Sequence, residues 1–224
     1  MIHPASPIDI VSKKAIFDSS LTPFTFTKFK TALTKIEHRQ YSGVGVSGGG
    51  LSEPYSSLSF HLHWGNGASV PGSEHTVDGR RYPMESSYNG NITAALADSE
   101  GIAEHGFFIE ASNDTTGKPE SWKTLTSYLS KITEKGQSVA ISDEISLDDL
   151  LPNVNRKRFY RYLGSLEIPN CHEAVVWTVF KEPVKVCKDL IDLFSKTVRI
   201  GNSTSAYITN NHRITQPELP VTYS

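Results

Sequence analysis

The sequence is poor in cysteine, has no excess of charge of either sign and contains no long apolar run. Its only two cysteines, Cys171 and Cys187, flank the strand-like run 174–180. An extended run of this length spans roughly 23 Å, whereas the Cα atoms of a disulfide lie within about 7 Å of each other. We therefore expect two free thiols, and a disulfide-stapled scaffold is excluded.

The charge and hydropathy patterns exclude two further classes of protein. Lys and Arg total 22 and Asp and Glu total 24, a formal net charge of −2, so a broad basic surface for nucleic acids is excluded. No run approaches the roughly 18 consecutive apolar residues of a membrane span, and Met1 is not followed by the basic and apolar stretches of a signal peptide. Attachment to a membrane would therefore need a segment outside this chain.

Apolar residues are nevertheless abundant enough for one sizeable domain. They make up 38% of the 224 residues, and no repeat or change of composition marks a boundary, so we expect a single domain over residues 1–224. Period-two and continuous apolar runs predict strands at residues 8–10, 58–64, 76–82, 102–111 and 174–180. Helical spacing predicts helices at 120–136 and 186–196. The predicted class is mainly β (α+β), with one large sheet and peripheral helices.

The run 60–65 (FHLHWG) carries the clearest chemical signal. Residues two apart on a strand project to the same face, so His61 and His63 are expected to lie side by side. Two imidazoles in this arrangement can supply two ligands to one zinc ion, which needs a third protein ligand and, in an enzyme, an open position for water. The pattern alone leaves a second interpretation open, in which both residues are ordinary hydrogen-bonded histidines.

The chain as a whole resembles the α-carbonic anhydrases. The resemblance rests on segments that follow one another in the family's order: 6–10 (SPIDI), 60–65 (FHLHWG), 72–85 (GSEHTVDGRRYPME), 162–166 (YLGSL), 176–183 (VWTVFKEP) and 216–217 (QP). It implies a large, mostly antiparallel twisted sheet and a cleft whose floor holds zinc bound by three histidines. It also implies that this chain, which begins just before Ser6, lacks the family's N-terminal segment.

Matched to the family, His61 and His63 resemble the first two zinc ligands. The third ligand is expected on the neighbouring strand, two residues beyond Glu85, where this sequence has Ser87. A serine hydroxyl is a poor zinc donor beside an imidazole, and two ligands hold zinc less tightly than three. We therefore expect an incomplete site without bound metal.

Other positions depart from the family in the same direction. Glu74 resembles the family's buried glutamate and is retained, as Glu85 is, but Glu167 stands where a threonine orients the attacking oxygen. The positions that normally line the carbon dioxide pocket with aliphatic side chains hold Asn89 and Glu104. Burying a carboxylate there is costly unless it is paired or protonated. Together these departures predict a loss of catalysis.

The leading hypothesis is therefore a non-catalytic binding domain, a carbonic anhydrase-like pseudoenzyme without a cofactor. Within the family it resembles the carbonic anhydrase-related proteins and the poxvirus cell-surface-binding protein, which implies cell adhesion or viral attachment at an extracellular or virion surface. The implied partner is a cell-surface glycan, such as a glycosaminoglycan, or a protein. Sequons at Asn91, Asn113 and Asn202 are compatible with an exposed protein.

Basic residues supply the candidate ligand surface. The run 156–161 is rich in arginine, whose planar guanidinium suits sulfate and carboxylate groups, and residues 80 and 81 form a second basic pair. The candidates are Arg156, Lys157, Arg158, Arg161, Arg80 and Arg81. Because exposed basic runs are often only solvated, this surface is a hypothesis.

The alternative hypothesis is an active, zinc-dependent carbonic anhydrase. Zinc accepts carboxylate oxygen, so Glu104 or Glu167 could replace the missing ligand and complete a site of two histidines and one carboxylate. In a third interpretation, Glu104 and His105 form a charge-assisted pair that fills a cavity without metal. Zinc content and chelator-sensitive hydration of carbon dioxide separate these hypotheses.

Overall fold

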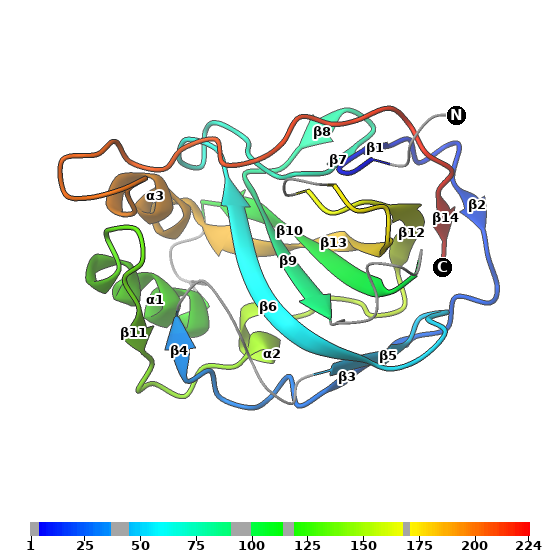
Figure 1. Cartoon of the computed structure of the whole chain (residues 1–224), viewed down its shortest axis with the longest axis horizontal. Coiled ribbons are helices and arrows are strands. Elements are labelled where there is room, and N and C mark those ends of the chain that lie inside the picture. Colours follow the sequence, from blue (N-terminus) through cyan, green and yellow to red (C-terminus); the bar gives the residue numbers. More distant parts are fainter. Residues whose placement is uncertain (1–4, 37–44, 91–99, 114–118, 168–170) are drawn as a thin grey trace.

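The computed structural model describes residues 5–36, 45–90, 100–113, 119–167 and 171–224. Nine strands form one large twisted sheet in the spatial order β2, β14, β12, β13, β10, β9, β6, β5 and β3 (Figure 1). In that order the strands are Ile16–Phe17, Thr222–Tyr223, Phe159–Gly164, Val175–Cys187, Ile102–Ser112, Met84–Gly90, Tyr55–Trp64, Gly45–Gly48 and Phe24–Thr27. A separate two-stranded sheet consists of β4 (Lys35–Ile36) and β11 (Val139–Ala140).

Most neighbouring strands of the large sheet run antiparallel, but β10 with β13 and β14 with β2 run parallel. The predicted mainly β class with a large, mostly antiparallel sheet is confirmed, and the sheet is mixed at these two places. The strands predicted at 58–64, 102–111 and 174–180 correspond to β6, β10 and β13. Strand β13 runs on to Cys187, which is a free thiol, as is Cys171. The prediction of free cysteines is therefore confirmed.

The prediction of one strand at 76–82 is wrong. Strands β7 (Thr76–Val77) and β8 (Arg80–Arg81) form a hairpin instead, and β7 also pairs with β1 (Asp9–Ile10). The turn residues Asp78 and Gly79 have φ angles of 50° and 77°. This left-handed conformation is open to glycine and tolerated by aspartate, so the chain reverses at this point.

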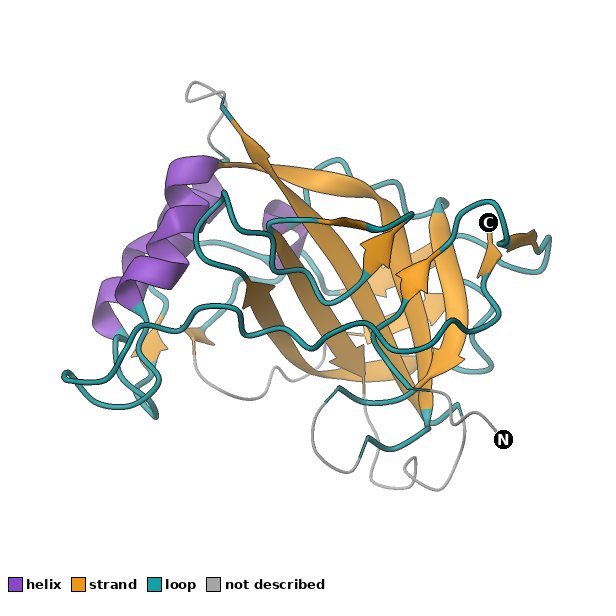
Figure 2. Cartoon of the chain, turned by 90° about the horizontal axis from the view of Figure 1, so that it is seen from above, coloured by secondary structure: helices purple, strands orange, loops and turns teal. Residues whose placement is uncertain are grey.

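The two longest helices lie side by side at one end of the sheet (Figures 1 and 2). The helices are Glu120–Ser127 (α1), Tyr128–Lys131 (η2, a 3₁₀ helix), Leu147–Leu150 (α2) and Lys188–Thr197 (α3). The helix predicted at 120–136 is shorter, because it tightens into η2 and ends before Ile132. The helix predicted at 186–196 starts two residues later, because β13 extends that far. No helix in the described part of the chain is long and apolar enough to cross a membrane.

The strands that escape the sequence prediction are β2, β3, β4, β5, β9, β11, β12 and β14, and β9 shows why. It reads MESSYNG and lies between β10 and β6, in the interior of the sheet. Glu85 and Ser87 project to one face, and Met84 and Ser86 to the other. Because buried polar residues occur on both faces, the strand has no period-two apolar pattern.

The two faces of the sheet carry separate apolar cores. Neighbouring residues of β10 alternate between them, with Phe107 in the first core and Phe108 in the second. The first core contains Phe194 of α3 and therefore lies on the side of the helices. His63 is in register with Glu85, and Glu85 with Phe108, so the candidate histidines share the face of the second core.

Candidate metal centre

Strand β6 places its two histidines beside strand β9. In the register of the sheet, His61 is paired with Ser87 and His63 with Glu85, so these four side chains share one face. The ring centroids of the two histidines lie 5.4 Å apart. The structure therefore brings the predicted histidine pair together and places Ser87 opposite its first member.

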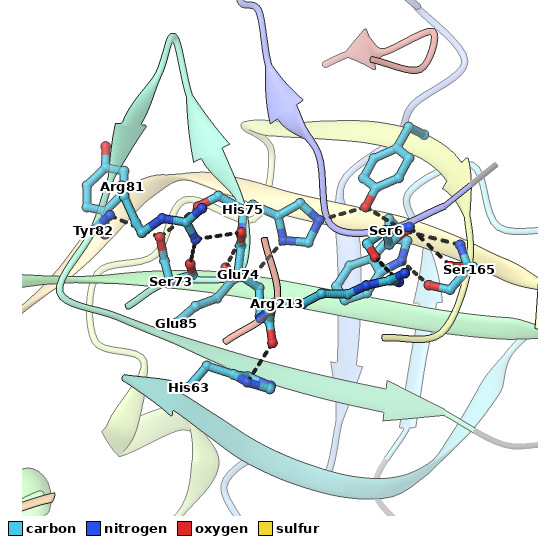
Figure 3. Close-up of polar contacts among 12 residues, drawn as sticks. Ser6, His63, Ser73, Glu74, His75, Arg81, Tyr82, Glu85, Ser165 and Arg213 are labelled. Atoms are coloured by element: carbon cyan, nitrogen blue, oxygen red, sulfur yellow. Dashed lines mark hydrogen bonds and ion pairs between the residues drawn. The ribbon is translucent and has the colours of Figure 1, made fainter. Parts of the chain in front are cut away.

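The two ring nitrogens of His63 have different surroundings (Figure 3). Nδ1 lies 2.8 Å from Oε1 of Glu74 and 3.0 Å from the carbonyl oxygen of Asn211. Nε2 is buried and has no hydrogen-bond partner within the described residues. Burial favours a lower pKa of His63, but the hydrogen bond and charge of Glu74 outweigh it and raise the pKa. At His61, burial and then the charge of His63 lower the pKa to about 4, which keeps this imidazole neutral near pH 7.

Both carboxylate oxygens of Glu74 are engaged. Oε1 contacts His63, and Oε2 accepts a hydrogen bond of 2.7 Å from the backbone N–H of Arg213. Arg81 donates to the backbone carbonyl of Glu74 at 3.0 Å and so holds the loop before β7 (Figure 3). Glu74 is thus a fixed acceptor that orients the ring of His63.

Glu167, in the loop after β12, lies close to His63 and Glu74. The possible ligand atoms of His63, Glu74 and Glu167 all lie within 4.8 Å of one another. Oε1 of Glu167 and Oγ of Ser87 are buried without a hydrogen-bond partner in the described part of the chain, as is Nε2 of His63. We call His61, His63, Ser87 and Glu167 the donor cluster.

The charges around Glu167 are unbalanced. Burial is the largest cause that raises the pKa of Glu167 well above its ordinary value, followed by the charges of Glu74, Glu104 and Glu85. Only Arg213 acts in the opposite direction among the causes of this shift. A divalent cation bound here would supply the missing positive charge.

A second buried network lies beside the donor cluster, and its contacts are shown in Figure 3. Nδ1 of His75 lies 2.8 Å from Oε1 of Glu85, and Nε2 lies 2.6 Å from the hydroxyl of Tyr162. That hydroxyl donates to Oγ of Ser6 at 2.9 Å, and the same Oγ accepts the backbone N–H of Ser165. Burial opposes ionisation of Glu85, but the charge and hydrogen bonds of His75 lower its pKa. These five residues, the anchor network, tie the N-terminal segment to the loop after β12.

The pair expected between Glu104 and His105 does not form. The two residues are neighbours on β10, so their side chains project to opposite faces. Glu104 is buried on the face of the donor cluster and is in register with Asn89 and Trp177. The side chain of Asn89 lies outside the described part of the chain. The ring of His105 packs edge-on against Phe24, with centroids 5.0 Å apart, on the side of the first core.

The run 156–161 is largely paired with acidic residues. Arg156 forms an ion pair with Asp148, and Arg158 contacts Glu182 at 2.6 Å. Lys157 is exposed, and its backbone is held in the turn that precedes β12. The two arginines are therefore already neutralised by carboxylates, which weakens the expected attraction for a polyanion.

The other predicted basic residues lie in separate places. Arg161 is buried, with a relative exposure of 9%, and its guanidinium donates to Oγ1 of Thr178. Arg80 pairs with Glu110, and Arg81 donates to backbone carbonyls of the loop before β7. Strand alternation turns Arg161 inward, so the structure does not bring the six candidates together on one surface.

Sequence reasoning misses Asn211 and Arg213. Both belong to the extended segment between α3 and β14, which has no periodic pattern, and both touch the site through backbone atoms as well as side chains. Oδ1 of Asn211 accepts the backbone N–H of Trp64 at 2.7 Å, which fixes the end of β6. The only signal in the sequence is the family-like dipeptide 216–217 that follows them.

Comparison with known proteins gives consistent matches over nearly the whole chain. The profile of the eukaryotic-type carbonic anhydrase family matches residues 3–219. Carbonic anhydrase 4 of Rattus norvegicus is 33% identical over 227 residues, covering 95% of this chain and 72% of that protein. Carbonic anhydrase 4 of Oryctolagus cuniculus is 35% identical over 225 residues, covering 93% and 71%. Carbonic anhydrase 12 of Homo sapiens is 33% identical over 199 residues, covering 82% and 54%.

Proposed function

Because the chain belongs to the eukaryotic-type carbonic anhydrase family, we propose that it is a zinc-dependent enzyme that hydrates carbon dioxide. In this proposal zinc is held by His63 and Glu167, whose possible ligand atoms lie within 4.8 Å of each other, and by His61, which is not in that group but shares a face of β6 with His63. The chemistry of the donor set fits the metal, because zinc binds imidazole nitrogen and carboxylate oxygen.

The expectation of a pseudoenzyme is wrong. The relatives that match nearly the whole chain are named as carbonic anhydrases, which overturns the expected roles in cell adhesion, glycosaminoglycan binding and viral attachment. The expectation that no cofactor binds loses its support as well. The error came from equating Ser87 with loss of the metal, although a carboxylate, Glu167, lies within reach of His63. An extracellular location and a cell-surface partner stay predictions.

One observation carries the proposal: three polar atoms of the donor cluster are buried and have no hydrogen-bond partner in the described residues. They are Nε2 of His63, Oγ of Ser87 and Oε1 of Glu167. A buried polar atom without a hydrogen-bond partner lowers the stability of the fold by about 1 to 3 kcal/mol. A ligand that binds to the atom would remove this cost. The surplus of carboxylates around Glu167 indicates that the ligand is a cation.

Glu167 is a better third ligand than Glu74, although both lie near His63. Both oxygens of Glu74 are occupied, by Nδ1 of His63 and by the N–H of Arg213, whereas Oε1 of Glu167 is unpartnered in the described residues. Glu74 instead accepts from Nδ1 and leaves Nε2 of His63 directed into the donor cluster.

When bound, zinc would acidify a water molecule to a pKa of about 7 and so supply the nucleophile. The protein's own residues would position that water. Ser87 offers a buried hydroxyl opposite His61, able to hydrogen-bond the attacking oxygen. In the family that this chain resembles, a threonine hydroxyl stands at the position of Glu167 and a zinc ligand at the position of Ser87. The two roles would thus be exchanged here, with Glu167 as the ligand and Ser87 as the hydroxyl.

Glu104 is expected to slow the reaction. It is 4% exposed and lies on the same face as the donor cluster, beside Trp177. A carboxylate at this place offers carbon dioxide a polar wall, which binds an apolar molecule less well than an aliphatic one. We expect Glu104→Val to raise kcat/KM for hydration about tenfold, an increase equal to about 1.4 kcal/mol of transition-state stabilisation.

The test is to load the protein with zinc, remove free metal and measure zinc per chain together with carbon dioxide hydration, with and without a chelator. The expected result is about one zinc per chain and turnover that the chelator abolishes. Ser87→Ala should keep the zinc and lower kcat, because the hydroxyl acts on the water and not on the metal. Glu110→Gln, which alters a partly exposed carboxylate that pairs with Arg80, is the matched control and should change neither quantity.

Two outcomes would overturn the proposal. Protein that folds and retains no zinc after removal of free metal would show that the donor cluster does not hold the ion. Turnover unaffected by the chelator would show that hydration, if present, does not need it. Ser87→His distinguishes a wrong assignment of the zinc site from weak binding at the assigned site. A third imidazole opposite His61 should raise zinc affinity only if zinc binds in the donor cluster.

A further inference from the structure

A second pocket lies along strand β6 and is lined there mostly by side chains that face away from the donor cluster, although His61 also lines it. Its volume is about 520 Å³, within the range of about 300 to 1,000 Å³ common for small-molecule sites. Phe60, Leu62 and Trp64 line it, and they alternate along β6 with His61, which also lines it, and His63. We call it the back pocket.

The walls of the back pocket are apolar and come from several elements. Helix α1 and η2 supply Leu125 and Leu129, and α3 supplies Phe194. The ring of Phe194 lies 5.4 Å from that of Trp64, whose indole N–H donates to the carbonyl of Ile208 at 2.8 Å. The pocket is therefore bounded by side chains that are packed or hydrogen-bonded, and not by a loop alone.

The rim of the back pocket contains two cations and one carboxylate. Arg199 donates to the carbonyl of Ser205 at 2.6 Å and to the hydroxyl of Tyr207 at 2.9 Å, so within the described residues its hydrogen bonds go to neutral acceptors. Lys135 is exposed and forms no ion pair with a described residue. Glu134 is the carboxylate, which leaves the rim with a net positive charge.

We propose that the back pocket binds a long-chain carboxylic acid. The hydrocarbon tail lies among Leu62, Trp64 and Leu129, and the carboxylate lies at the rim near Lys135 and Arg199. The combination of an apolar interior and a cationic rim selects a ligand with an apolar tail and a single negative charge. A neutral alcohol of equal length would fill the interior without meeting the rim, and a cationic amphiphile would meet it unfavourably.

This site is independent of the proposed zinc chemistry. His61 lines both sites, but Phe60, Leu62 and Trp64 face away from the donor cluster, and the proposed carboxylate contacts at the rim do not involve His61, so a carboxylic acid should bind equally well to protein treated with a chelator. Failure of zinc to bind would leave the back pocket untouched. Failure of the carboxylic acid to bind would leave the zinc proposal untouched.

The experiment measures binding of laurate, decanoate and octanoate below their micellar concentrations, by calorimetry and by the fluorescence of Trp64. The expected result is saturable binding to one site. The affinity should rise about fourfold for each added methylene, because burying one methylene contributes about 0.8 kcal/mol. Dodecanol should bind more weakly than laurate, and dodecyltrimethylammonium should bind weakest.

Variants separate the interior from the rim. Val198→Phe and Ile132→Phe each add a ring to the pocket wall and should weaken laurate binding about tenfold or more, because they displace about two methylenes of the tail. Arg199→Gln and Lys135→Gln should each weaken laurate binding about twofold to fivefold and leave dodecanol unchanged. The matched controls, Val70→Phe and Lys157→Gln, lie outside the pocket and should change nothing.

Three results would each overturn the proposal. One is the absence of saturable laurate binding in folded protein. Another is equal affinity for laurate and dodecyltrimethylammonium, which would show that the rim charge has no role. The last is a dimer in sedimentation experiments that both Val198→Phe and Ile132→Phe dissociate. A second copy of the chain would then occupy the back pocket.

Discussion

The anchor network and the donor cluster are built from the same residue types and differ in whether their atoms are satisfied. In the anchor network both nitrogens of His75 and both oxygens of Glu85 have partners. In the donor cluster, Nε2 of His63 and Oε1 of Glu167 are buried without a partner in the described residues. A fully bonded network stabilises the fold, whereas a partly bonded one costs free energy until a ligand completes it. The difference separates the histidine that holds the architecture from the one available for chemistry.

Breaking the anchor network should have the largest effect on stability. His75→Ala leaves the buried carboxylate of Glu85 without the imidazole 2.8 Å from it, so we expect the free energy of unfolding to fall by about 3 to 5 kcal/mol. Urea unfolding of the zinc-free protein measures the change.

Two serines provide a matched control for that experiment. Oγ of Ser6 accepts two hydrogen bonds, from the hydroxyl of Tyr162 and from the backbone N–H of Ser165, whereas Oγ of Ser87 has no partner in the described part of the chain. Ser6→Ala should therefore destabilise the protein by about 1 to 3 kcal/mol, and Ser87→Ala should leave stability nearly unchanged. Equal losses from the two serine variants would contradict the distinction between the networks.

Removing a charge from the donor cluster should have a smaller effect on folding and a clear one on metal. Glu167→Gln keeps the shape but removes a carboxylate that lies among Glu74, Glu85 and Glu104. We expect zinc affinity, measured by competition with a chelator, to fall about a hundredfold, equal to about 2.7 kcal/mol. The unfolding free energy of the zinc-free variant should stay the same or rise by about 1 kcal/mol, because the raised pKa of Glu167 shows that burying this carboxyl among other carboxylates is costly.

Glu74→Gln is the comparison for that variant. Glu74 orients His63 through Nδ1 and would not touch the metal, so its loss should weaken zinc binding by about tenfold, less than the loss of Glu167. If Glu74→Gln had the larger effect, Glu74 would be the third ligand and the assignment of Glu167 would be wrong.

Residues that share one strand were predictable from the sequence, and contacts between distant segments were not. The alternation of β6 predicts that His61 and His63 share a face, and the family resemblance puts Ser87 on the adjacent strand. The contact of Glu74 with His63 joins a loop to a strand, and no periodicity describes it. The position of Arg213 depends on how a long irregular segment crosses the site.

The basic run 156–161 is a second case in which contacts between distant segments were not predictable from the sequence. A row of arginines in sequence suggests a positive surface, but Asp148 and Glu182 come from other parts of the chain to neutralise Arg156 and Arg158. The strand that follows turns Arg161 into the interior. A run of basic residues in the sequence therefore predicts a positively charged surface only where the segments that pack against the run are also known.

His105 sharpens the comparison, because it is unsatisfied but not part of a cluster. Neither ring nitrogen makes a hydrogen bond of good geometry in the described residues, the backbone of Tyr88 raises the pKa of the ring only as the smallest of its causes, and the ring packs among Phe24, Tyr88 and Phe180. Burial and then the charge of Arg161 lower the pKa of His105 to about 3. An unpartnered histidine surrounded by aromatic rings has no second donor to share a metal with, so we expect it only to reduce stability.

The last prediction follows from that pKa. Below pH 6.5 the unfolded chain takes up a proton at His105 that the folded protein refuses until about pH 3, so stability is lost as the pH falls through this window. His105→Leu removes this loss, and its advantage over the parent should grow by at most about 1.4 kcal/mol for each pH unit between pH 6.5 and 4.5. Urea unfolding at several pH values measures it, with Phe107→Leu, an apolar change on the same face of β10, as the pH-independent control. A difference between His105→Leu and the parent that stays constant with pH would mean that His105 is protonated in the folded protein, and its cage would then have to contain a partner for the charge.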